Sequence, residues 1–219
     1  MAPKAFVSWS SGKDAAYALV EARRLGLAEV VGALTTVNAA FDRVAMHGVR
    51  RSVLERQMAA LGLPCLQVPL PFPCSNEVYE AQMAEACAKM KANGIRHVVF
   101  GDLFLEDIRQ YREQRLAAAG MEGIFPLWQR PTRGLAAEML DAGMVAHLAC
   151  VDSKQLDPRV AGRRWDRALL AELPPGVDPC GENGEFHTLV TAGPMFAAPI
   201  AVSPGETVRR EGFVYSDFV

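Results

Sequence analysis

The sequence lacks the cysteine pattern of a disulfide framework or a zinc site. Its five cysteines are an odd number, are widely spaced, and include no Cys-x-x-Cys. Secreted frameworks and thiolate zinc sites both need cysteines in pairs at short spacings. We therefore expect buried thiols. They are Cys65, Cys74, Cys87, Cys150 and Cys180.

Long apolar runs and a strong net charge are also absent. No run approaches the ~20 apolar residues that a membrane helix needs, and no secretory leader pattern is present at the N-terminus. The net charge of −2 gives no general attraction to nucleic acid. Half the residues are hydrophobic and 22% are charged, which is typical of a globular protein. We therefore expect a cytoplasmic location, with no membrane and no nucleic acid as partner.

The two best-known phosphate-binding motifs are missing as well. A Walker A loop needs Ser or Thr after its Gly-Lys, whereas Asp14 follows Lys13, and no Gly-x-Gly-x-x-Gly occurs. A different loop of the same general kind is present. Residues 4–9 are a short β-prone run, residues 10–14 interrupt it, and an Ala/Leu-rich helix follows as far as Gly26.

A loop between a strand and the start of a helix can bind phosphate. The unpaired backbone N–H groups and the positive end of the helix dipole point toward whatever lies above it. Gly12 lets the backbone approach a ligand closely, and Lys13 supplies a mobile positive charge. Ser10 and Ser11 add hydroxyl donors. The alternative is a Ser/Gly turn that only caps a helix.

Strands and helices alternate along the first part of the chain with the spacing of a parallel sheet covered on both faces. We predict a doubly wound α/β domain over residues 1–125 and a smaller α+β domain over 126–219. The predicted strands are 29–37, 65–70, 95–100 and 144–151, and the predicted helices are 49–61, 77–93, 106–119, 133–142 and 163–173.

Three polar segments lie where such a sheet places ligand-contacting groups. Met46-His47 precedes a predicted helix, Gly101-Asp102 follows a strand, and Cys180 to Thr188 holds two glycines, two carboxylates, a His and a Thr. Each has a plainer interpretation: a surface histidine, a simple turn and an exposed hairpin, respectively. For the last segment alone, the residues favour the hairpin over a loop held above a site.

In combination, these segments resemble the diphthine–ammonia ligase family of ATP pyrophosphatases, from Phe6 to about Phe196. The family's Ser-Gly-Gly-Lys-Asp-Ser is similar to residues 10–15, its Met-x-His loop to Met46-His47, and its Gly-Asp-Ile to residues 101–103. Its Arg and Glu fall on Arg109 and Glu113. Its Pro-Leu-Trp and Cys-Gly-Glu-x-Gly-Glu-Tyr-Glu-Thr fall on residues 126–128 and 180–188.

The resemblance implies a ligase that cleaves ATP to AMP and pyrophosphate, adenylates a substrate carboxylate and amidates it with ammonia. It implies nucleotide binding by Ser10, Ser11, Gly12, Lys13, Asp14, Met46, His47, Gly101 and Asp102. The acceptor and ammonia side would comprise Arg109, Glu113, Glu182, Gly184, Glu185, His187 and Thr188. Catalysis is expected from Lys13, Asp14, Glu182 and Glu185, and Mg2+ is expected at Asp14 and Asp102.

Three departures from the family pattern fall on the acceptor side. Tyr111 stands where a second arginine is frequent, Phe186 replaces Tyr, and His187 replaces Glu. The acceptor, a small molecule or a protein carboxylate, therefore stays open. Arg outnumbers Lys 18 to 5, which suggests a GC-rich bacterial source, where the diphthine of elongation factor two would be absent. The nitrogen donor, the separate roles of Glu182 and Glu185 and the oligomeric state, with a homodimer among the alternatives, are open too.

Two other functions are compatible with the same loop. A tRNA-modifying ATP pyrophosphatase of the sulfur-transferring kind would use paired cysteines, and the wide cysteine spacing argues against it. A non-catalytic sensor would bind ATP or AMP without turnover. The joint presence of Lys13, Asp14, Glu182 and Glu185 argues against a sensor.

Overall fold

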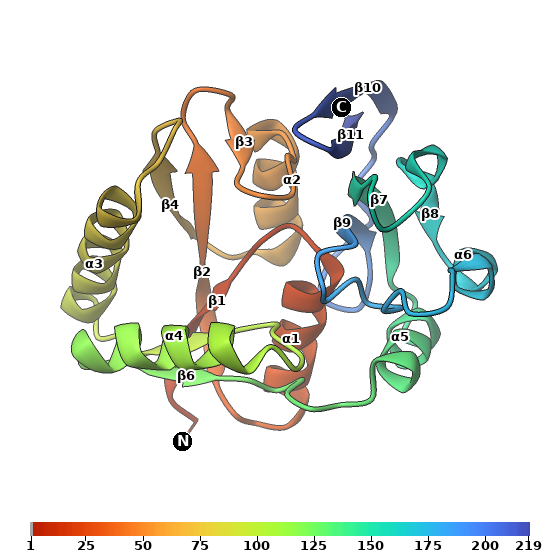
Figure 1. Cartoon of the computed structure of the whole chain (residues 1–219). Helices are drawn as coiled ribbons and strands as arrows, with labels where there is room; N and C mark the ends of the chain where they lie inside the picture. The colour runs from red at the N-terminus through yellow and green to blue at the C-terminus, as the bar shows by residue number, and fades with distance from the viewer. Residues whose placement is uncertain (1) are drawn as a thin grey trace.

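The structure is a computed structural model that describes residues 2–219, whose strands form two sheets (Figure 1). In the first sheet β4 pairs with β2, β2 with β1, β1 with β5 and β5 with β6, all in parallel. The short β3 pairs antiparallel with the end of β2. The strands are β1 (Lys4–Ser8), β2 (Glu29–Asn38), β3 (Arg43–Val44), β4 (Cys65–Leu70), β5 (His97–Val99) and β6 (Glu122–Ile124).

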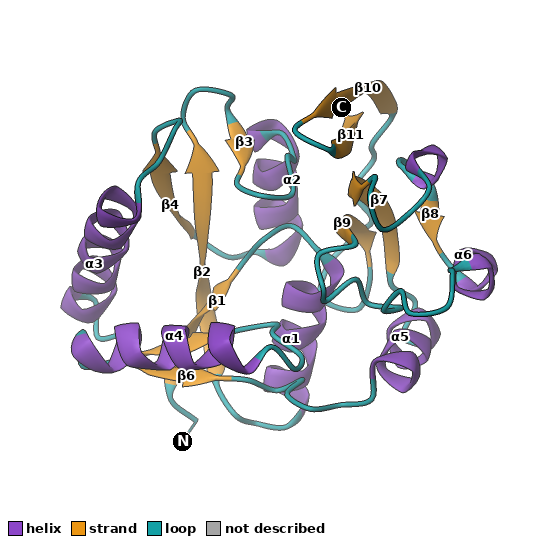
Figure 2. Cartoon of the chain, viewed as in Figure 1, coloured by secondary structure: helices purple, strands orange, loops and turns teal. Residues whose placement is uncertain are grey.

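Four helices cover the two faces of this sheet (Figure 2). They are α1 (Lys13–Arg24), α2 (Arg51–Leu61), α3 (Asn76–Ala92) and α4 (Glu106–Ala118). Because side chains alternate along a strand, the two faces have separate cores. Val7 and Val37 pack with α1 and α2, whereas Leu34 and Val98 pack with α3 and α4. The predicted α/β fold class is confirmed.

The second sheet is antiparallel and built around β7 (Val145–Asp152). Its neighbours are β9 (Phe186–Ala192), β8 (Arg164–Trp165) and β11 (Phe213–Phe218), and β10 (Pro204–Arg210) pairs with β11. Two helices, α5 (Thr132–Asp141) and α6 (Arg167–Glu172), and a 3-10 turn, η1 (Pro158–Val160), complete this part. The boundary expected between residues 125 and 126 falls just after β6.

The prediction of a helix over 163–173 is wrong in its first half. Trp165 is completely buried, pairs with Ala146 of β7 and donates its indole N–H to the Pro179 carbonyl at 3.0 Å. Burial of this large ring favours an extended segment there. The helix begins only after Asp166, whose side chain accepts from the Leu169 N–H.

The two sheets meet where the strand order of the parallel sheet reverses. From β1 the chain continues to β2 on one side, while β5 lies on the other side of β1. The antiparallel sheet contacts this point through β9: the Val190 N–H donates to the Ser11 carbonyl, and the Lys13 N–H donates to Thr188 Oγ1. This reversal is where open α/β sheets bind ligands. None of the helices within residues 2–219 could cross a membrane.

Candidate active site

A cavity of about 1000 Å³ opens at the carboxyl edge of the parallel sheet. Its size is that of a small-molecule site. Segments far apart in the sequence contribute to it, because β1, β5 and the loop before β9 all end at the same place. The predicted site residues that line it are Ser10, Asp14, Met46, His47, Gly101, Asp102, Glu182, His187 and Thr188.

Several other predicted residues lie outside the cavity lining and support the loops instead. Ser11 is fully buried with φ +70°, and its carbonyl accepts from the Gln57 amide at 3.1 Å. Gly12 lies against His47: a Cβ on Gly12 would be 2.6 Å from the His47 ring, so a side chain would push that ring away. The predicted residues outside the lining are Ser11, Gly12, Lys13, Arg109, Glu113, Gly184 and Glu185.

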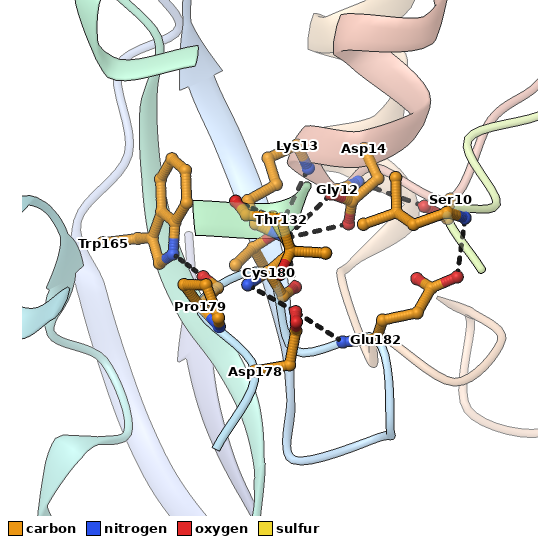
Figure 3. A network of polar contacts seen from close by, with 12 residues as sticks. Ser10, Gly12, Lys13, Asp14, Thr132, Trp165, Asp178, Pro179, Cys180 and Glu182 are labelled. Atoms are coloured by element: carbon orange, nitrogen blue, oxygen red, sulfur yellow. Dashed lines mark hydrogen bonds and ion pairs between the residues drawn. The ribbon is translucent and has the colours of Figure 1, made fainter. Parts of the chain in front are cut away.

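The Lys13 side chain turns beneath the loop rather than into the cavity. Its ammonium donates to both Asp14 carboxylate oxygens at 2.9 Å and to the Cys180 carbonyl (Figure 3). The rings of Trp165 and Phe186 lie 5.3 and 5.6 Å from it. Burial opposes the charge, but the nearby negative groups, Asp14 foremost, outweigh burial and raise the pKa of Lys13. A buried positive charge therefore joins the loop of residues 10–14 to the loop that begins at Cys180.

Three carboxylates line the cavity near this charge, those of Asp14, Asp102 and Glu182. Glu182 Oε1 accepts from the Leu103 N–H at 2.7 Å. Burial raises the pKa of Glu182 to about 7, and the Asp14 and Asp102 carboxylates add to the increase. A carboxyl group with a pKa near neutrality can exchange a proton with a bound reactant at physiological pH.

The oxygen donors of the cavity suit a hard cation that arrives with phosphates. Among residues 2–219, no three His, Cys, Asp or Glu side chains converge as a metal cluster. Mg2+ is usually held by one or two carboxylates together with substrate phosphates, so a dedicated cage is not needed. Asp14 is 25% exposed and Asp102 13% exposed, and both line the cavity. These residues fit Mg2+ only in company with a phosphate ligand.

Glu185 has a different position from Glu182. Its carboxylate is 1% exposed, and Oε1 accepts from the Asp178 N–H at 2.8 Å and from the Asn183 amide at 3.1 Å. Its Oε2 is buried without a hydrogen-bond partner within the described residues. Glu185 therefore shapes the loop from inside, and Glu182 is the one that reaches the cavity. Sequence spacing could not separate two glutamates on one loop.

Two histidines lie side by side in the cavity wall. The ring centroids of His47 and His187 are 4.7 Å apart, and His47 Nδ1 lies 2.8 Å from the Thr188 carbonyl. Because a carbonyl can only accept, Nδ1 carries the hydrogen. Burial lowers the pKa of His47 to about 4 and that of His187 to about 3, and the positive charge of Lys13 contributes to both. Both rings are therefore neutral at pH 7.

The chain is similar to known proteins over about half of its length. Residues 131–217 match the family model described as the diphthamide synthase C-terminal domain. The chain is 31% identical over 110 residues to diphthine–ammonia ligase of Homo sapiens. The aligned region covers 48% of this chain and 41% of that protein. With the Bos taurus ligase it shares 29% over 118 residues, which is 51% of this chain and 44% of that protein.

The chain is a distant relative of the diphthine–ammonia ligases. With the Schizosaccharomyces pombe ligase it shares 30% over 95 residues, which is 42% of this chain and 16% of that protein. The chain thus spans less than half the length of the ligases that it matches.

The part that matches the diphthamide synthase C-terminal domain also holds the loop that carries His47. Asp217 in β11 pairs with Arg43 at 2.7 Å and accepts from Arg50 Nε at 2.9 Å. Burial opposes ionisation of Asp217, but the hydrogen bonds from the two arginines outweigh it and lower the pKa to about 2. Sequence reasoning missed Asp217, because its partners lie 167 and 174 residues away and no local pattern marks it.

Arg109 and Glu113, which the ligase resemblance places on the acceptor side, lie away from the cavity. Arg109 Nε donates to Glu113 at 2.8 Å, and its guanidinium lies 4.9 and 4.7 Å from the rings of Phe125 and Trp128. They attach α4 to the segment after β6. Arg112, one helical turn further on, lines the cavity instead. No sequence signal separates Arg112 from Arg109, because residues three apart lie on the same face of a helix.

Proposed function

We propose that this chain is an AMP-forming ligase that activates a carboxylate with ATP and converts it to an amide with ammonia. One observation carries the proposal: Lys13 joins a phosphate-type loop to the Cys180 loop, so that Asp14, Asp102 and Glu182 face one cavity. The distant relatives are named for diphthine and ammonia as substrates. Ammonia is therefore the proposed nitrogen source, and a carboxylate is the proposed acceptor class.

The reaction has two bond-exchange steps. An acceptor carboxylate oxygen attacks the α-phosphorus of ATP, the bond from that phosphorus to the bridging oxygen breaks, and pyrophosphate leaves with the electron pair. The nitrogen of ammonia then attacks the acyl carbon, and AMP leaves as the C–O bond breaks. The nitrogen loses a proton as the amide forms.

Residues of the chain serve these steps by charge and position. The N-terminus of α1 and the Lys13 charge would stabilise the negative charge on the departing pyrophosphate. Glu182, with its pKa raised to about 7 chiefly by burial, would accept the proton from the nitrogen. Asp14 and Asp102 would hold Mg2+, which neutralises phosphate charge when bound. His47 and His187, both neutral, would contribute hydrogen bonds without adding charge.

The product of ATP cleavage tests the proposal. The purified chain is incubated with ATP, Mg2+, ammonium and pools of carboxylates, and AMP plus pyrophosphate is resolved from ADP plus phosphate. We expect AMP and pyrophosphate in amounts that depend on a carboxylate pool. ADP as the product would contradict the proposal. Tight ATP binding without AMP from any pool would favour the sensor alternative over an enzyme.

A further inference from the structure

The cavity extends from the phosphate end into a trough between α3 and α4. Both helices are long, yet only Ala86, Cys87 and Met90 are buried within Asn76–Ala92 and only Leu116 within Glu106–Ala118. The inner faces of the helices pack on the sheet through these few residues and also border the cavity. Apolar trough-lining side chains are Met83, Cys87, Met90 and Leu116 of the helices and Leu34 and Val98 of the sheet.

The trough is elongated, and its lining combines apolar side chains with the charged Glu80, Lys91 and Arg115. The lining residues of α3 run from Tyr79 to Lys91, which is about 18 Å at the rise of an α-helix. Polar contacts tie the two helices together: Glu80 pairs with Arg115, and Lys91 Nζ donates to the Ala119 carbonyl at 2.6 Å. The Arg115 side chain is 54% exposed, so its ion pair lies toward solvent.

A cationic group stands at the end of the trough nearest the phosphate loop. Arg112 is 32% exposed, its Nε lies 2.9 Å from Asp102, and its guanidinium lies 4.6 Å from the Phe100 ring. Arg112 Nε and Asp102 Oδ2 are both buried, and neither has a hydrogen-bond partner of good geometry within residues 2–219. An arginine can bind a carboxylate through two parallel hydrogen bonds, so the unsatisfied guanidinium of Arg112 suits a carboxylate ligand.

We propose that the trough binds an elongated apolar monocarboxylate, with the carboxylate on Arg112 and the hydrocarbon body along α3. The apolar part of the lining favours a hydrocarbon body over phosphate and ribose, which would lose hydrogen bonds to water there. The carboxylate end would lie beside Asp102, next to the phosphate end of the cavity. The role of this ligand as the acceptor rests on the proposed function, whereas its binding does not.

Binding of straight-chain alkyl carboxylates, measured by titration calorimetry without ATP, tests the inference. We expect affinity to rise about fourfold for each added methylene until the trough is full, because each buries apolar surface. Alcohols of the same length should bind at least about tenfold more weakly, since they lack the charge that pairs with Arg112. Affinity that is independent of chain length, or equal for alcohols, would overturn the proposal.

Two variants of α3 locate the binding. Ala81 and Ala84 are both exposed, but only Ala84 lines the trough. Ala84→Trp should lower the affinity for the best alkyl carboxylate at least about tenfold by filling the trough, and Ala81→Trp should leave it unchanged. If Ala84→Trp weakened ATP binding as much as carboxylate binding, the trough would belong to the nucleotide site and the inference would be wrong.

A chemical probe covers the case in which Ala84→Trp does not fold. In a Cys65→Ala, Cys74→Ser background, which removes the half-buried and the exposed thiol, the bound carboxylate should slow alkylation of Cys87 and ATP should not. Protection by ATP alone would overturn the inference. Alkyl carboxylate binding without AMP formation would contradict the proposed function alone, and AMP formation with small polar carboxylates but no alkyl binding would contradict the trough proposal alone.

Discussion

Lys13 illustrates how one buried charge can organise a site. The ammonium has three donors and meets the Asp14 carboxylate and the Cys180 carbonyl, so it links α1 to the loop before β9. The charge lies next to the phosphate end of the cavity without entering it. Its contribution to catalysis would therefore come through the electric field and through the position of Asp14.

Replacing Lys13 with alanine should reduce pyrophosphate release by at least about a hundredfold, because the charge beneath the phosphate loop is lost. The measurement is initial rate with saturating ATP, with circular dichroism to show that the variant is folded. Lys4→Ala, at an exposed position, is the matched control and should keep the wild-type rate. Near-normal pyrophosphate release in a folded Lys13→Ala variant would exclude this role.

The buried histidines predict how stability depends on pH. Burial depresses the pKa of His187 from 6.5 to about 3, so below pH 6.5 the unfolded chain takes up a proton that the folded chain does not. Stability should therefore fall as pH decreases through 6.5, and at about pH 5 this residue alone should cost about 2 kcal/mol relative to neutral pH.

The test is the urea unfolding free energy of His187→Gln at neutral pH and near pH 5. This variant should lose less stability on acidification than the wild type, by about 2 kcal/mol. His97→Gln is the control. It keeps the rings of His47 and His187 and should lose as much stability on acidification as the wild type. An unchanged pH dependence in His187→Gln would contradict the burial of a neutral His187.

The sequence indicated which residues lie near the site better than it indicated where their side chains point. Lys13 and Gly12 were found because a strand, a turn and a helix can be read locally. The inward turn of Lys13 could not be found, because it depends on Cys180, 167 residues away. Arg112 was missed in favour of Arg109, because the rotation of α4 about its axis follows from its packing on Phe125 and Trp128.

In the loop from Asp178 to Glu185, the two glutamates have different roles that the sequence alone could not distinguish: Glu185 stabilises the loop, and Glu182 reaches the cavity. Glu185→Ala should lower the free energy of unfolding by about 1 to 3 kcal/mol, because the Asp178 N–H would lose its buried acceptor. Glu182→Ala should destabilise less, because it removes a carboxylate whose burial disfavours its charge, but it should abolish amide formation.

Urea denaturation and amide yield, measured on both variants, check this pair. The wild-type chain is the reference for both quantities. A Glu185→Ala variant that is fully stable and inactive, beside a Glu182→Ala variant that is unstable and active, would reverse the assignment.

The β3 segment and the loop that follows it are held in place by Asp217 of β11. Asp217→Asn should weaken the pairing with Arg43 and Arg50 and lower the free energy of unfolding by about 1 to 3 kcal/mol. It should also raise the KM for ATP more than it lowers kcat, because the loop that carries His47 loses its anchor. Asp42→Asn, which removes an exposed pair with Arg51, should change stability by at most about 0.5 kcal/mol. Equal effects of the two substitutions would contradict the anchoring role.

In the whole molecule, two sheets with different construction contribute to one cavity. The parallel sheet could be predicted from its apolar runs and alternating helices, because that pattern repeats over short distances. The antiparallel sheet was predicted only as strand-like pieces. The short β3, β6 and β8 were missed, because strands of two or three residues are too short to show a periodic pattern. The Cys180 loop, whose residues favoured a hairpin, lies at the cavity because β9 pairs along β7 and reaches α1.

Exchange of radiolabelled pyrophosphate into ATP tests the central claim most directly, because it reports carboxylate adenylation without ammonia. The wild-type chain is incubated with ATP, Mg2+, labelled pyrophosphate and a carboxylate series that includes long alkyl acids. If the chain adenylates a carboxylate, labelled pyrophosphate should be incorporated into ATP only when a carboxylate acceptor is present. ATP that stays unlabelled with every carboxylate, while the chain binds ATP or forms ADP, would contradict this claim.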